Sequence, residues 1–172
     1  MALNYKLNRA AEILQRLTAS EAARLDRICT GIRRAEGRLS KRSAPLVEKC
    51  VANCRGLCCR NAAFDDIIGL ADFIYILRLA PHLEEPMRAC LVDEKPFFTA
   101  DCPFLAQGRG PCIFADDLRP EVCITTFCAD TTDLRNEIRD VRRGFAALGR
   151  FLLRHRLETV GSMRLPFWRR WS

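Results

Sequence analysis

The sequence lacks any apolar run long enough to cross a membrane. A helical span needs about 18 or more apolar residues, and the most apolar stretch, around 67–77, is broken or flanked by Asp65, Asp66 and Asp72. The first residues have no uninterrupted apolar block and no small-residue cleavage site, because Lys6 falls inside them. We therefore expect a cytoplasmic protein with no transmembrane segment and no secretory signal.

The patterns of several enzyme classes are also missing. No Ser/His/Asp, Cys/His or paired-carboxylate arrangement stands out, and no Gly-rich turn between a strand and a helix is present to cradle a nucleotide-like cofactor. Internal repeats and low-complexity tracts are absent as well. The sequence therefore assigns no catalytic residue and leaves open whether the protein is an enzyme.

Histidine is scarce, whereas cysteine is abundant: the 172 residues include 2 His and 10 Cys. In a reducing compartment this count does not fit a disulfide framework, which leaves metal binding or thiol chemistry. His82 and His155 both lie far from the cysteine clusters in sequence, so a metal site must use sulfur almost exclusively. An all-sulfur donor set suits zinc and iron-sulfur clusters and disfavours magnesium, calcium and the iron of non-haem oxygenases.

Charge divides the chain into three segments of one predicted domain, residues 1–172. Residues 1–49 carry 11 Lys/Arg and 5 Asp/Glu, residues 50–130 carry 7 and 12, and residues 131–172 carry 10 and 4. Nine of the ten cysteines and six of the eight prolines fall in the acidic middle segment. We expect basic helical flanks around a cysteine-rich core.

Hydrophobic periodicity predicts a mainly α fold in which amphipathic helices frame an irregular Cys/Pro-rich metal-binding centre. Apolar residues recur every three or four positions up to about residue 38, where Gly37 and a polar run predict the end of the helix. Ser20 followed by Glu21 predicts a cap for a second helix within this flank. Further helices are predicted over 64–79 and 133–157, whereas no period survives between 81 and 130.

Eight cysteines form two clusters. A soft metal centre needs several thiolates that converge, and short spacings around Gly or Pro allow this without core packing. The candidate ligands are Cys50, Cys54, Cys58 and Cys59 in the head cluster and Cys102, Cys112, Cys123 and, as the last choice, Cys128 in the tail cluster. Cys29 and Cys90 are expected outside the site. If both clusters bind one centre, metal binding closes a long loop and orders residues 81–130.

These residues resemble those of the YkgJ-type cysteine-cluster family, whose domain is described as zinc- or iron-chelating and is often labelled iron-sulfur-cluster-containing. The resemblance spans about residues 50–128 and rests on an ordered set of motifs. The motifs are the head cluster Cys50, Cys54, Cys58 and Cys59, then Phe64-Asp-Asp-Ile67, Cys102-Pro-Phe-Leu105, Cys112-Ile-Phe114 and Arg119-Pro-Glu-Val-Cys123.

The resemblance implies a metal-binding protein with a redox or accessory role and favours an iron-sulfur cluster, of the 4Fe-4S type, over a single zinc or iron ion. Eight clustered thiols also exceed the four that one zinc site takes. A related branch is similar to the flagellin lysine-N-methylases, which makes a protein N-methylase an alternative function. The spacing of the cysteines by itself does not separate zinc from iron-sulfur.

Arginine dominates the basic flanks, with 24 Arg against 4 Lys in the whole chain. One interpretation is a zinc-stapled nucleic-acid-binding module, because the region around 135–156 is rich in arginine. The other is a solvated polar face balanced by the acidic centre, which we favour because no aromatic binding motif accompanies the arginines. A protein partner that docks on the basic flanks remains a further alternative.

Overall fold

The computed structural model describes residues 2–54, 59, 67–92, 102–106 and 111–162, without the side chains of 50–54 and 156–162. Most of these residues are helical, and no strand occurs among them apart from one isolated β-bridge between Leu105 and Cys112. The prediction of a mainly α fold is therefore confirmed. No helix in this described part is long and apolar enough to cross a membrane.

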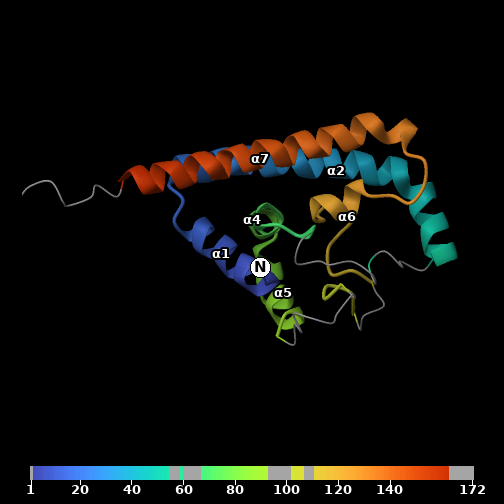
Figure 1. Cartoon of the computed structure of the whole chain (residues 1–172), viewed down its shortest axis with the longest axis horizontal. Coiled ribbons are helices and arrows are strands. Elements are labelled where there is room, and N and C mark those ends of the chain that lie inside the picture. The colour runs from blue at the N-terminus through green and yellow to red at the C-terminus, as the bar shows by residue number, and fades with distance from the viewer. Residues whose placement is uncertain (1, 55–58, 60–66, 93–101, 107–110, 163–172) are drawn as a thin grey trace, which may run out of the picture.

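Two long helices form the spine of the molecule. α2 (Ala19–Cys54) and α7 (Arg135–Ser162) run antiparallel along each other (Figure 1). Both bury an apolar stripe at helical spacing, with Leu25, Ile32 and Leu39 on α2 and Ile138, Val141, Phe145 and Leu148 on α7. They approach closely at Gly144, where an added Cβ would meet Cγ1 of Ile32 at 2.7 Å. The prediction of one helix over 133–157 is confirmed.

The predicted end of the first flank near residue 38 is wrong, because α2 continues through Gly37 and Pro45 to Cys54. The buried face of the helix does not stop at Gly37, because Leu39 and Ser43 are both buried. Tertiary packing of this face outweighs the local helix-breaking preferences. The Ser43 hydroxyl donates a hydrogen bond to the Ser40 carbonyl at 3.3 Å, which meets its need for a buried partner.

The N-terminus of α2 is capped by Thr18 and not, as predicted, by Ser20. The Thr18 amide donates to Oε2 of Glu21 at 2.8 Å, and the Glu21 amide donates to the Thr18 hydroxyl at 3.3 Å. This reciprocal pair is a capping box, which requires two residues between its members. Ser20 lies two positions too late for that geometry.

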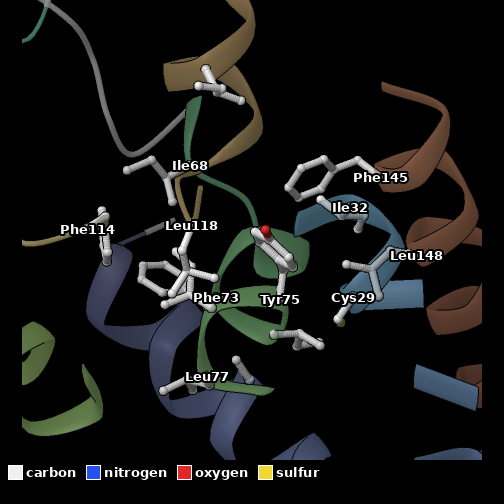
Figure 2. Packing of buried hydrophobic residues seen from close by; sticks show 14 of the residues in the cluster. Cys29, Ile32, Ile68, Phe73, Tyr75, Leu77, Phe114, Leu118, Phe145 and Leu148 are labelled. Carbon is white, nitrogen blue, oxygen red and sulfur yellow. The ribbon is translucent and has the colours of Figure 1, made fainter. Parts of the chain in front are cut away.

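α4 (Leu70–Leu79) is the buried centre of the fold, and α1 (Leu3–Gln15) packs beside it. Figure 2 shows Tyr75 of α4 facing Ile32 of α2 and Phe145 of α7. The rings of Tyr75 and Phe145 meet edge to face, with their centroids 5.3 Å apart. The helix begins later than the predicted residue 64, because Asp72 accepts a hydrogen bond from the Gly69 amide at 2.7 Å and caps it there. Residues 64–66 lie outside the described part.

The middle segment is more ordered than its lack of periodicity predicts. It contains the short helices η2 (Pro81–Leu83), α5 (Glu84–Cys90) and α6 (Glu121–Thr125), and η4 (Thr132–Leu134) follows it directly before α7. Core residues come from separate turns and not from one face of a helix: Phe104, Phe114, Leu118 and Ile124 are all buried. The expectation that residues 81–130 lack a core of their own is therefore wrong for the described part, because these buried side chains provide one.

A buried carboxyl group, Glu36 of α2, lies inside this core. Its side chain is 0% exposed, and its Oε2 accepts a hydrogen bond from the Arg119 amide at 3.0 Å. Its Oε1 has no hydrogen-bond partner among the described residues. Burial raises the pKa of Glu36 to about 8, against the lowering effect of the Arg119 and Tyr75 hydrogen bonds, and the nearby carboxylates of Asp72 and Asp117 add to the rise. The side chain is therefore largely protonated at pH 7.

Glu36 makes stability depend on pH. An unfolded glutamate titrates near its ordinary pKa of 4.5, whereas folded Glu36 titrates near 8, so the folded state holds an extra proton in between. Its favourable contribution is complete below about pH 4.5 and is lost as the pH rises towards 8. From pH 5 to pH 8, the wild-type protein should lose roughly 3–4 kcal/mol of unfolding free energy relative to Glu36→Gln. Urea unfolding at the two pH values measures this difference.

The matched control is Glu85→Gln, because Glu85 is exposed on α5. This variant should follow the wild-type protein at both pH values. A Glu36→Gln variant whose stability changes with pH just as the wild type's does would contradict the assignment of the buried proton.

Candidate metal centre

Two of the predicted ligands, Cys102 and Cys112, lie in a hairpin-like turn. The Ile113 amide donates to the Phe104 carbonyl at 3.0 Å, and the Ala106 amide donates to the Pro111 carbonyl at 2.9 Å. The bridge between Leu105 and Cys112 lies between these two bonds. Although residues 107–110 lie outside the described part, the bonds on either side bring the two arms of the turn together.

The head and tail clusters meet at Cys59 and Cys102. The Cys102 amide donates a hydrogen bond to the Cys59 carbonyl at 2.8 Å. Cys102 is buried and Cys59 is half-buried. Residues 43 positions apart in sequence are thus adjacent in space, as the proposal of one shared centre requires.

Cys123 is positioned by α6 and by a buried carboxylate beneath that helix. One oxygen of Asp72 accepts the hydrogen bond from Gly69, and the other accepts one from the Glu121 amide at 2.7 Å. Asp72 is 6% exposed, and burial raises its pKa against the lowering effect of these two hydrogen bonds. Asp72 therefore ties the start of α6, two residues before Cys123, to the start of α4.

The thiols of the cluster are close enough to affect one another's ionisation. Burial raises the pKa of Cys102 to about 12, and Cys112, Cys59 and Cys90 add to the rise. Solvent reaches Cys123, but the protein atoms around its thiol desolvate it and raise its pKa, and Cys102, Cys59 and Cys112 raise it further. We call Cys59, Cys102, Cys112 and Cys123 the thiol cluster. A bound cation would offset this mutual repulsion of thiolates.

An aromatic platform supports the hairpin-like turn. The ring of Phe104 packs against Phe73 of α4, with centroids 6.2 Å apart, and against Phe114, with centroids 5.0 Å apart. Figure 2 shows Phe73, Phe114 and Leu118 together on one side of α4. The turn that carries Cys102 and Cys112 is therefore fixed to the most buried helix of the fold.

The structure describes the remaining predicted ligands only in part. Cys50 and Cys54 lie one turn apart at the end of α2, but their side chains are outside the described part, as is all of Cys58. Cys128 is exposed, three residues beyond the end of α6. Within the described residues, no three His, Cys, Asp or Glu side chains are close enough together to hold a metal ion.

The two cysteines predicted to lie outside the site differ from each other. Cys29 is fully buried against the α2–α7 spine, and burial raises its pKa to about 12, as expected of a core residue. Cys90, at the end of α5, is half-buried, and its pKa is raised by burial and then by Cys112. Sequence reasoning missed Cys90 because it belongs to no short-spaced motif, and only the abundance of cysteine hinted at its place beside the cluster.

His155 of α7 lies beside the start of α2, with its Nδ1 2.8 Å from Oε1 of Glu21. No protein-family model, curated protein or solved structure matches this chain. The resemblance to the cysteine-cluster family therefore rests on the motifs of this sequence alone.

Proposed function

We propose that this chain is a cytoplasmic metal-binding protein of the cysteine-cluster type. The observation that supports the proposal best is the meeting of Cys59 with Cys102, because it joins two clusters that the sequence keeps far apart. The donor set is entirely sulfur, which fits an iron-sulfur cluster or zinc and does not fit hard cations. The head cysteines Cys50, Cys54 and Cys58 complete the pool of ligands.

An iron-sulfur cluster of the 4Fe-4S type is the form that we favour. The thiol cluster supplies four candidate thiolates, and the head cysteines supply more, which exceeds one four-thiolate zinc site. Neither histidine belongs to the thiol cluster. His82 lies in η2, and His155 pairs with Glu21. A redox or accessory role follows from such a centre.

The metal identity is tested by purification without oxygen, followed by an absorption spectrum and by iron, zinc and sulfide analysis. We expect a brown protein that absorbs near roughly 400 nm and contains iron and acid-labile sulfide. A colourless protein with stoichiometric zinc would replace iron-sulfur by zinc and keep the site. A protein that retains no metal under these conditions would contradict the proposed function.

A further inference from the structure

The charges of α7 are sorted onto different sides of the helix. Its carboxylates are used by α2: Nη1 of Arg42 lies 2.5 Å from Oε1 of Glu137, and Nη2 of Arg38 lies 3.4 Å from Oδ2 of Asp140. These two ion pairs hold the antiparallel helices together along their polar edge. They also leave the arginines on the other side of α7 with few acidic partners.

Those arginines line one side of a hollow between α7 and the segment around α6. The hollow has a volume of about 520 Å³. We call it the arginine groove, and its lining residues are Thr125, Thr131, Arg135, Ile138, Arg139, Arg142, Arg143 and Ala146. No carboxylate belongs to this lining.

The four guanidinium groups of the groove are only partly compensated by carboxylates. Arg139 bonds the neutral amide of Asn136 at 2.6 Å, and Arg143 lies 3.9 Å from Asp140, whose carboxylate also serves Arg38. Among the described residues, neither Arg135 nor Arg142 forms an ion pair, although the carboxylates of Asp130 and Glu121 are near enough to interact with them electrostatically. Like charges held this close on one helix face repel one another, so an anionic ligand would relieve a cost that the free protein carries.

We propose that the arginine groove binds the phosphate backbone of a nucleic acid. Guanidinium groups present fork-shaped donors that match phosphate oxygens. Arg135, Arg139 and Arg142 follow one another along about 10 Å of the α7 axis, which gives a row of positive charge and not a single point. Such a row suits a ligand with repeated negative charges.

The lining favours nucleic acid over an acidic protein as the occupant. Protein interfaces depend on apolar or aromatic anchors that become buried, and the exposed large hydrophobic residues of the described part lie elsewhere, at Tyr5, Val47, Val92 and Leu153. Nucleic-acid interfaces are more polar and more positive. Because no aromatic ring lines the groove, we expect backbone binding with little base preference.

The groove lies beside the proposed metal centre but does not depend on it. Thr125 closes one side of the groove and lies two residues after Cys123 on the same short helix, α6. The arginines themselves are carried by α7, whose position is fixed by its packing on α2. Nucleic-acid binding can therefore fail while metal binding holds, and the reverse.

The test measures the binding of the full chain to a short fluorescent DNA duplex and to a single-stranded RNA of the same length, by anisotropy at several salt concentrations. Arg139→Gln with Arg142→Gln should weaken binding at low salt by at least about tenfold and should lower the salt slope by about 2. The control is Arg16→Gln with Arg34→Gln, which removes the same charge from two exposed sites outside the groove. The control should keep the wild-type slope.

Three results would overturn the proposal. The first is no binding of either probe at low salt, and the second is an equal loss in the groove and control variants. The third is a polyglutamate peptide that binds as tightly as the nucleic acids at every salt concentration, which would indicate an acidic protein partner instead. If the double variant loses helical circular dichroism, Arg135→Gln alone serves in its place, with a slope lowered by about 1.

Discussion

Cys102→Ala and Cys123→Ala should each abolish stoichiometric metal binding. Cys102 lies at the junction of the head and tail clusters, through its hydrogen bond to Cys59, and Cys123 is held beside them by α6. A four-thiolate centre that loses one ligand has no described histidine nearby to replace it. Metal analysis after anaerobic purification should give less than about a tenth of the wild-type metal, together with loss of the absorption near roughly 400 nm.

Cys29→Ala is the matched control for this loss. Cys29 is buried, as Cys102 is, but it lies in the α2–α7 core and away from the thiol cluster. This variant should keep its metal although it loses some stability through the cavity that it leaves. If Cys102→Ala and Cys123→Ala bind metal as the wild type does, the assigned site is wrong whatever the metal is.

Asp72→Ala should produce the largest loss of stability from a single polar residue. Its carboxylate accepts hydrogen bonds from two amides, those of Gly69 and Glu121, at 2.7 Å each. Removing it leaves both donors unpaired near the core and releases the start of α6 from the start of α4. We expect the free energy of unfolding to fall by about 3–5 kcal/mol, measured by urea denaturation.

Asp72→Asn separates hydrogen bonding from packing at this position. Its amide oxygen accepts one of the two hydrogen bonds, but its NH₂ group cannot accept the other. Its stability should therefore lie between those of the wild type and Asp72→Ala. An Asp72→Ala variant within about 1 kcal/mol of the wild type would mean that α6 is held by other contacts.

The long helices were predictable because their apolar residues repeat at helical spacing over many turns. The helix predicted over 133–157 matches α7 closely for this reason. The extent of α2 was not predictable, since Gly37 and Pro45 are local signals for an end, and only the packing of Leu39 and Ser43 against other elements keeps the helix going. Local preference and tertiary packing disagree at these positions, and packing prevails.

The types of residue in the candidate site were predictable from the sequence, but the contacts that position them were less so. Short spacings around Gly and Pro singled out Cys59, Cys102, Cys112 and Cys123, which the structure brings near one another. The hydrogen bond from Asp72 to the start of α6 and the position of Cys90 near Cys112 were not predictable, because both depend on contacts between segments far apart in sequence.

X-ray absorption spectroscopy of the anaerobically purified protein is the most direct test of a cysteine-ligated centre. The measurement gives the element and the atoms that surround it. We predict iron with a first shell of sulfur only, at about 2.3 Å, and we predict that Cys123→Ala loses this signal. A first shell of nitrogen or oxygen, or a metal signal that survives in Cys123→Ala unchanged, would contradict the proposed centre.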